Sequence, residues 1–261
     1  MSAEALPEVI AYADGACRGN PGPGGYGVVL MTGSHRKELS GGCRKTTNNR
    51  MELLAAIRAL QALKKKCRLV LHTDSKYLVE GINKGWAIRW RSKHWWITAN
   101  RRAKNSDLWA ELLTLIEAHE VKIVWVKGHV GIEDNERADR LAESAATRPD
   151  LPPDEGYERL LANPEPMSIP EGTPCFKCGT PVVKREPKLK PKHGLTHCYQ
   201  WFMYCPSCKS TYTTEDAKRI VVAPPQLPLC LCRRSETQRV VPVDRRPLAN
   251  FSRQSTPSNC R

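Results

Sequence analysis

The chain has 261 residues, enough for one or two domains with a sizeable core. Its formal net charge is +14, with an excess of +7 in residues 1–150 and another +7 in residues 151–261. This excess favours a polyanionic partner, nucleic acid first, over a merely basic protein. No apolar stretch reaches the length of about eighteen residues that a membrane helix needs, and no secretory signal begins the chain. We therefore expect a cytoplasmic monomer with no membrane partner, whose eleven cysteines stay reduced.

The pattern of apolar residues over residues 8–148 predicts one α/β unit. Apolar runs predict strands at residues 9–14, 26–32, 37–44, 68–73 and 122–127. Helical periodicity predicts helices at residues 49–65, 75–84, 107–119 and 135–147. Three meandering strands followed by alternating helices and strands predict a five-stranded mixed sheet flanked by helices.

The composition changes after this unit. We expect a first domain at 1–148, a Pro-rich linker at 149–174, a small cysteine-rich module at 175–222 and a disordered basic tail at 223–261. The tail is rich in Pro, Arg and Ser and has few apolar clusters.

Two predicted strands end with an acid. The segment VIAYADG ends at Asp14, and LVLHTDS ends at Asp74. If the strands are neighbours, the carboxylates lie side by side and repel unless a cation neutralises them, and a hard divalent metal suits oxygen ligands. Each aspartate alone could simply begin a turn, but the pair favours a metal site.

Three more residues are candidates for the same site. Glu52 either closes a capping box near Asn49 or points toward the sheet, as its helical face with small apolar residues suggests. His129 lies in a Gly-flanked loop, and Asp139 lies one turn into the last helix. A histidine near carboxylates can carry protons near neutral pH, although a lone loop histidine is usually polar surface.

The first aspartate is followed by a Gly-rich stretch, YADGACRGNPGPGGYG. A phosphate cradle needs consecutive N–H groups and a following helix, whereas here Pro21 and Pro23 remove two donors and a strand follows. We expect the glycines to form a low-profile turn that lets a duplex backbone approach Asp14.

Four segments together resemble a known family. YADGACRGNPGPGGYG, TTNNRMEL, HTDSKY and VKGHVGIEDNERADRLA are similar, in order and spacing, to the signature segments of bacterial type 1 ribonuclease H. The resemblance covers roughly residues 9–146, which is nearly the whole first unit.

The resemblance implies hydrolysis of the RNA strand of an RNA–DNA hybrid, leaving 5′-phosphate and 3′-hydroxyl ends. By this resemblance Asp14, Glu52, Asp74 and Asp139 bind two Mg²⁺ ions, which Mn²⁺ can replace, and His129 assists proton transfer and product departure.

The resemblance also implies residues that contact the hybrid. Cys17, Asn20, Asn48 and Asn49 resemble residues that contact the two strands, and Thr47 resembles part of a pocket for a DNA-strand phosphate. Lys76 departs from the family, in which many members have Gln, because a lysine cannot mimic an amide on a base edge.

Residues 81–106 hold seven Lys/Arg, no acid and four interleaved tryptophans. They resemble the basic protrusion that grips the hybrid in this family. We expect substrate contacts from Trp86, Arg89, Trp90 and Lys93. The alternative is a hairpin whose tryptophans pack together and whose charges are only solvated.

Two CxxC pairs, at Cys175/Cys178 and at Cys205/Cys208, predict a zinc ribbon with one structural Zn²⁺. Redox CxxC pairs are the alternative, and other possible ligands are His193, His197 and Cys198. The insert between the pairs is basic and aromatic, so the module's partner is either nucleic acid or protein.

Two other functions stay open. The first is a nucleic-acid-binding module of the same fold without catalysis, which loss of any one of the acids would favour. The second is another nuclease of the same fold, such as a resolvase, which would share only the acidic core.

Overall fold

The computed structural model describes residues 6–163, 168–187 and 197–220. Its main feature is a five-stranded sheet in the order β3-β2-β1-β4-β7. The first three strands pair antiparallel, whereas β4 and β7 run parallel to β1. The strands are β1 (Glu8–Cys17), β2 (Gly22–Thr32), β3 (His35–Thr46), β4 (Arg68–Thr73) and β7 (Glu120–Trp125). The predicted fold class, a mixed sheet flanked by helices, is confirmed.

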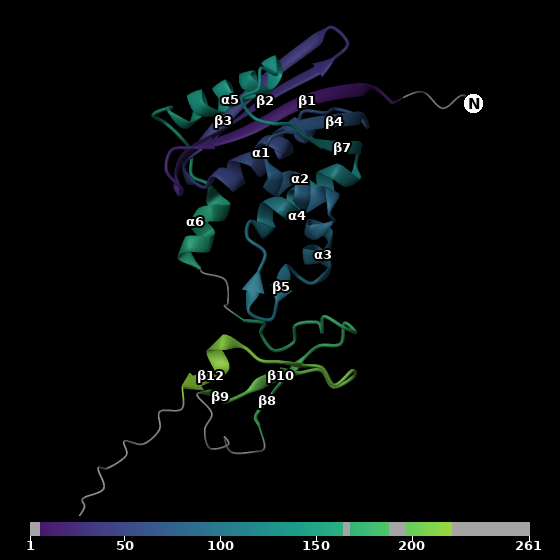
Figure 1. The fold of residues 1–261 in the computed structure, drawn as a ribbon, viewed down its shortest axis with the longest axis vertical. Coiled ribbons are helices and arrows are strands. Elements are labelled where there is room, and N and C mark those ends of the chain that lie inside the picture. Colours follow the sequence, from purple (N-terminus) through teal and green to yellow (C-terminus); the bar gives the residue numbers. More distant parts are fainter. Residues whose placement is uncertain (1–5, 164–167, 188–196, 221–261) are drawn as a thin grey trace, which may run out of the picture. The chain divides into compact units, whose positions relative to one another are not determined.

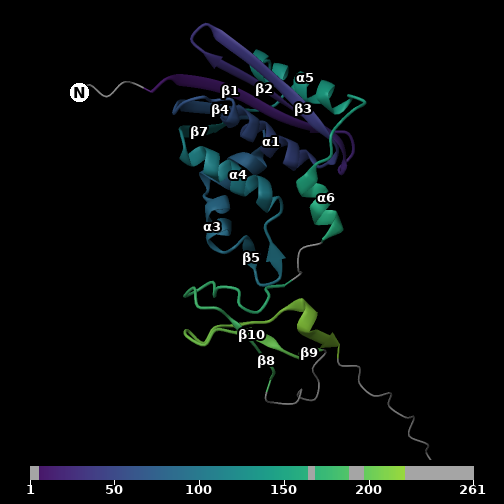
Figure 2. The same ribbon diagram turned by 180° about the vertical axis from the view of Figure 1, so that it is seen from behind.

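Helices cover both faces of this sheet (Figures 1 and 2). Helix α5 packs on β1, β2 and β3, while α1 packs on the opposite face with α4 behind it. The helices of this unit are α1 (Asn48–Gln61), α2 (Lys76–Asn83), α3 (Trp86–Ser92), α4 (Ser106–Glu117), α5 (Glu133–Ala146) and α6 (Glu155–Ala162). Within the residues described, no helix has the length and apolar character to cross a membrane.

The main core lies between α1 and the sheet. Leu53 and Ile57 of α1 are completely buried against Val28 and Leu69 of the strands, and Trp109 of α4 closes the far side. Burying side chains of this size stabilises each position by about 1.5–3 kcal/mol, so this layer holds α1 firmly on the sheet.

The Gly-rich stretch differs from its prediction. Most of it is strand, because β1 extends to Cys17 and β2 begins at Gly22. The glycines serve helix packing: a Cβ on Gly15 would lie 2.3 Å from the backbone N of Glu52, and one on Gly27 would lie 2.0 Å from the carbonyl O of Ala138. These glycines therefore bring α1 and α5 close to the strands.

The segment predicted to be a linker, residues 149–174, contains a helix. Helix α6 follows Asp154, whose side chain caps it by accepting a hydrogen bond from the N–H of Tyr157. The prolines before it misled the sequence analysis, because the short apolar pattern of EGYERLLA is weak by itself. The exact domain boundaries stay predictions, and the predicted tail at 223–261 lies outside the described residues.

The basic Trp-rich segment and the cysteine-rich module contain short elements. Helix α3 is followed by a two-stranded ribbon of β5 (Trp96–Thr98) and β6 (Arg101–Arg102). The module has a small sheet of β8 (Val183–Arg185), β10 (Phe202–Tyr204) and β11 (Thr211–Tyr212), and a pair of β9 (His197–Tyr199) and β12 (Lys218–Ile220). A 3₁₀ turn at Glu215–Ala217 precedes β12.

Candidate active site and cysteine cluster

Asp14 lies on the central strand, and its carboxyl group is the most strongly perturbed acid of the site. Pairing of Tyr12 with His72 in the parallel β1–β4 ladder places Asp14 and Asp74 at equivalent positions two residues further along. Burial, and then repulsion from Asp74, raises the pKa of Asp14 from 3.8 to about 8. The N–H of Gly15 donates to the carboxylate at 2.7 Å and partly opposes this rise. The predicted pairing of the two strand-end acids is present.

Glu52 points from α1 toward the same edge of the sheet. The Asn48 amide donates to its Oε1 at 2.9 Å, and the Ser75 hydroxyl donates to its Oε2. Burial raises its pKa, and repulsion from Asp74 adds to the rise. The capping-box alternative is wrong, because the N-cap of α1 is Thr47 and no side chain caps the helix there.

Asp74 and Asp139 complete the set of acids. Burial raises the pKa of Asp74, repulsion from Asp139 raises it further, and attraction to His129 opposes the rise. Asp139 on α5 also repels Asp14. His129 is 78% exposed in the loop before α5, with its Nδ1 3.6 Å from Asp139 Oδ2. The structure therefore brings together all five residues that the sequence analysis selected.

The donor set at this edge suits a hard divalent cation. Its groups are carboxylate oxygens from β1, α1, α5 and the end of β4, and hard cations take oxygen ligands. Burial first, and repulsion between the acids second, raises the pKa values of Asp14, Glu52 and Asp74, and a bound cation would offset both effects. The residues present therefore fit a divalent metal.

Five predicted substrate-binding residues gather beside the acids. Cys17 donates from Sγ to the carbonyl groups of Gly22 (3.5 Å) and Thr46 (3.6 Å), so its thiol links the start of β2 to the end of β3. Asn20 and Asn48 are joined by a hydrogen bond of 3.4 Å from the Asn48 N–H to Asn20 Oδ1. The remaining two residues line a cavity of about 390 Å³ with Asn20; they are Thr47 and Asn49.

Three further residues line this cavity and were not among the predicted substrate contacts. They are Lys104, Asn105 and Ser106, and α4 begins at Ser106. Of the three, only Lys104 is one of the seven basic residues of the segment 81–106. The Asn-Ser pair ahead of an amphipathic helix is a helix-start pattern that could have identified them.

The substrate contacts predicted for the basic segment lie on helix α3 and directly after it. Trp86, Arg89 and Trp90 belong to α3, and Trp90 packs edge-on against buried Trp109 at 6.0 Å. Trp90 therefore contributes to the core, as the packing alternative proposed. Lys93 follows this helix, with its ammonium 5.9 Å from the Phe176 ring. Lys76 begins α2, and its ammonium lies 5.6 Å from the Trp125 ring.

The four CxxC cysteines form a single cluster. The sulfur atoms of Cys175, Cys178, Cys205 and Cys208 lie within 4.8 Å of one another. Hydrogen bonds with Thr180 lower the pKa of Cys178 to about 5. Four converging sulfur ligands are the donor set of a structural metal site. Cys198, an alternative ligand, lies on β9 and is not part of the cluster.

Together the mixed sheet and the acids at its edge define an α/β protein with a nuclease-type acidic site. Residues 7–147 match the family model described as RNase H, and the chain belongs to this family of enzymes, the ribonucleases H.

Related proteins agree with this assignment. The Ribonuclease H of Syntrophus aciditrophicus is 59% identical over 150 residues, which cover 58% of this chain and 87% of the relative. The Ribonuclease H of Rippkaea orientalis is 57% identical and covers 58% and 93% of the two chains. The crystal structure of LC9-RNase H1, a type 1 RNase H with the type 2 active-site motif, matches with a TM-score of 0.51 and 33% identity, over 62% of this chain and 84% of that one.

Proposed function

We propose that this ribonuclease H hydrolyses the RNA strand of RNA–DNA hybrids and leaves 5′-phosphate and 3′-hydroxyl ends. The observation that carries the proposal is the convergence of four acids at one edge of the sheet, where burial and then repulsion between the acids raise the pKa of Asp14 to about 8. A fold that holds acids in this way supports divalent-cation chemistry.

Asp14, Glu52, Asp74 and Asp139 would hold the divalent cations, Mg²⁺ or Mn²⁺. Two cations bound there would supply an activated water and stabilise the leaving 3′-oxygen. Asn48 and Ser75 orient the Glu52 carboxylate through their hydrogen bonds. The Gly15 N–H does the same for Asp14.

His129 is the proton carrier in this proposal. Its exposed ring, 3.6 Å from Asp139, can take a proton at the site and release it to solvent. The backbone φ of 53° at His129 is unusual for a residue other than glycine and turns the loop sharply beside the acids.

Recognition of the hybrid is assigned to three groups of residues. Cys17, Asn20, Asn48 and Asn49 contact the two strands near the cleaved bond, and Thr47 helps to hold a DNA-strand phosphate. The basic α3 region, with Trp86, Arg89, Trp90 and Lys93, contacts backbone phosphates, and Lys76 can add a further phosphate contact. RNA is distinguished by its 2′-hydroxyl in the minor groove.

We also propose that the cysteine cluster holds one structural Zn²⁺ and that the protein acts as a cytoplasmic monomer. The four sulfur atoms of the cluster support a zinc site over two separate redox pairs. Sulfur atoms from one CxxC pair lie within 3.5 Å of sulfur atoms from the other pair. Whether the module binds nucleic acid or protein is left to experiment.

The test is cleavage of end-labelled substrates by the full chain in Mg²⁺. An RNA–DNA hybrid, a DNA duplex and an RNA duplex of the same sequence are compared. We expect cleavage of the RNA in the hybrid alone, with products that carry 5′-phosphates. Equal cleavage of the DNA duplex would favour a resolvase-type nuclease. Binding of the hybrid without cleavage in Mg²⁺ or Mn²⁺ would favour the non-catalytic module.

A further inference from the structure

Helix α6 belongs to a segment that the family match does not include. The match ends at residue 147, and α6 spans Glu155–Ala162. Nothing in the proposed function uses this helix. Its contacts show that it is nevertheless built into the unit that carries the acids.

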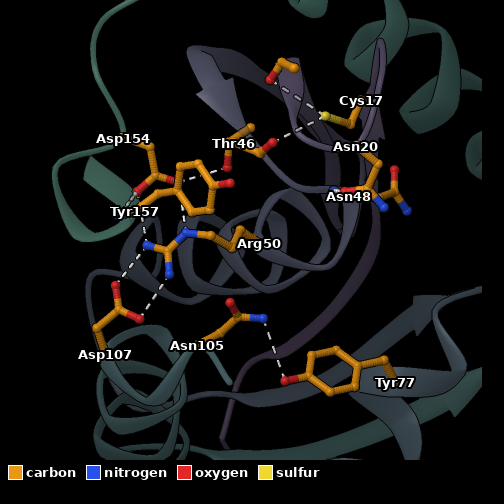
Figure 3. Close-up of polar contacts among 11 residues, drawn as sticks. Cys17, Asn20, Thr46, Asn48, Arg50, Tyr77, Asn105, Asp107, Asp154 and Tyr157 are labelled. Atoms are coloured by element: carbon orange, nitrogen blue, oxygen red, sulfur yellow. Dashed lines mark hydrogen bonds and ion pairs between the residues drawn. The ribbon is translucent and has the colours of Figure 1, made fainter. Parts of the chain in front are cut away.

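A buried ion-pair network anchors the start of α6 (Figure 3). Arg50 of α1, only 1% exposed, donates to both carboxylate oxygens of Asp154 at 2.7 and 2.8 Å. Arg50 also donates to both oxygens of Asp107 at 2.9 and 2.6 Å. The Thr46 hydroxyl donates to Asp154 at 2.6 Å. Asp154 therefore joins the α6 segment to the end of β3 and to the first turn of α1.

A second set of contacts fixes the orientation of the helix. The backbone N–H of Arg44 donates to the carbonyl of Pro152 at 2.9 Å, and the Arg44 guanidinium pairs with Glu158 at 2.9 Å. The side chain of Asp154 accepts a hydrogen bond from the N–H of Tyr157 at 3.0 Å and so caps the helix. The segment is therefore fixed before the helix at Pro152, at the N-cap Asp154 and in the first turn at Glu158.

This anchoring places α6 at the cavity of about 390 Å³ described above. Tyr157 and Leu160 of α6 line the cavity together with Asn20 and Thr47. Its lining residues include one cation, Lys104, together with amide and hydroxyl groups, and no acid. The helices α1 and α4 also begin at this cavity, with their positive dipole ends. Such a lining suits an anionic sugar–phosphate backbone.

We propose that α6 is part of the hybrid-binding surface, and that Tyr157 contacts the DNA-strand backbone of the hybrid in this cavity. The inference rests on the proposed function, which assigns Thr47 to a DNA-strand phosphate. The phenol of Tyr157 supplies a neutral hydrogen-bond donor for a phosphate oxygen, and its ring packs against the neighbouring sugar. Leu160 adds apolar contact beside it. Tyr157 is thus a positioning residue for the substrate.

The test uses hybrids in which a single neutral methylphosphonate replaces one DNA-strand phosphate at a time. Binding is measured with full-length protein carrying Asp14→Asn, so that the RNA is not cleaved. Tyr157→Phe and Tyr157→Ala are compared in this background. Leu161→Ala is the matched control, because Leu161 is on the same helix, is 54% exposed and does not line the cavity.

We expect Tyr157→Ala to weaken hybrid binding about ten- to a hundredfold, as the loss of one hydrogen bond to a charged group would do. Leu161→Ala leaves binding unchanged. In the protein that keeps Tyr157, a methylphosphonate at one position should weaken hybrid binding. In Tyr157→Phe, the methylphosphonate at that position should weaken binding by a smaller factor. Melting curves of all variants check that α6 remains folded.

Two results would overturn the inference. One is wild-type affinity in both Tyr157 variants. The other is a loss of affinity that is the same for every methylphosphonate position, since Tyr157 would then act away from the strand. Failure of the proposed function gives a different result. If the unsubstituted chain does not cleave the hybrid, both proposals are wrong. Normal cleavage with no Tyr157 effect overturns this inference alone.

Discussion

The acidic edge and the cysteine cluster bring like groups together by different physical means. The acids come from long elements of a large sheet, and the packing of that sheet holds them in place despite their repulsion. The cysteines come from two tight turns beside strands of two or three residues. A small module has little core to oppose such crowding, so there we expect the metal to hold the structure together. On the proposed function, a metal at the acidic edge would serve chemistry and a metal at the cysteine cluster would serve folding.

Removing the metal from the cysteine cluster should have the largest effect. Structural zinc contributes about 10–16 kcal/mol of binding free energy in small modules, so Cys175→Ser should lose the zinc and unfold the module. Metal analysis and limited proteolysis of the full chain measure this. Cys198→Ser, outside the cluster, should keep about one zinc per chain. A Cys175→Ser protein that keeps its metal and its protease resistance would contradict the comparison.

Neutralising one acid should affect chemistry and leave the fold intact. Asp14→Asn should lower hybrid cleavage about a thousandfold, because a ligand of the divalent cations is lost. Its melting temperature without metal should rise, since the buried, repelled carboxyl is gone. Glu143→Gln, an exposed acid one turn along α5 from Asp139, is the control and should change neither. Unfolding of Asp14→Asn would show that this edge also depends on its acids for stability.

Moving one carboxylate should have a smaller effect. A Cβ on Gly128 would lie 2.5 Å from Asp74 Oδ2, so Gly128→Ala must turn that carboxylate. We expect a loss of about ten- to hundredfold in kcat, because reacting groups tolerate little displacement. The melting temperature should change little, since only the end of a side chain moves. Val130→Ala in the same loop is the control, and kinetics with matched melting curves decide the outcome.

The pH dependence of stability is the smallest expected effect. The folded-state pKa of Asp14, about 8, exceeds its ordinary value of 3.8, so the folded chain binds the extra proton between these values. Without divalent cations, this group should make the free energy of unfolding fall as pH rises from about 4 to about 8. Urea titrations at several pH values measure the slope, which Asp14→Asn and added Mg²⁺ should both reduce. An unchanged slope in Asp14→Asn would assign the effect to other groups.

Much of this molecule could be predicted from local patterns. Each strand-end acid directly follows an apolar run, and the two CxxC pairs predict the cysteine cluster. Both features could be predicted because they depend on residues close together in the sequence. The partners of Glu52 could not be predicted in this way. Ser75, the N-cap of α2, lies 23 residues away, and only the packing of α1 against α2 brings the two together.

Long-range ion pairs and glycine packing limited the prediction further. Arg50 and Asp154 are 104 residues apart, and neither sequence environment indicates a buried pair. The sequence therefore predicts a linker where Asp154 caps a helix. The sequence indicates that the glycines do not form a phosphate-binding loop. Their role in allowing α1 and α5 to pack closely on the strands could not be predicted, because it depends on which helix crosses which strand.

That glycine packing makes the acidic site depend on the docking of two helices. Glu52 and Asp139 reach the site only when α1 and α5 lie tightly on Gly15 and Gly27. A nascent or partly folded chain, with its sheet formed but its helices undocked, would lack half of its acids. Hybrid cleavage would therefore report that both helices are docked on the sheet.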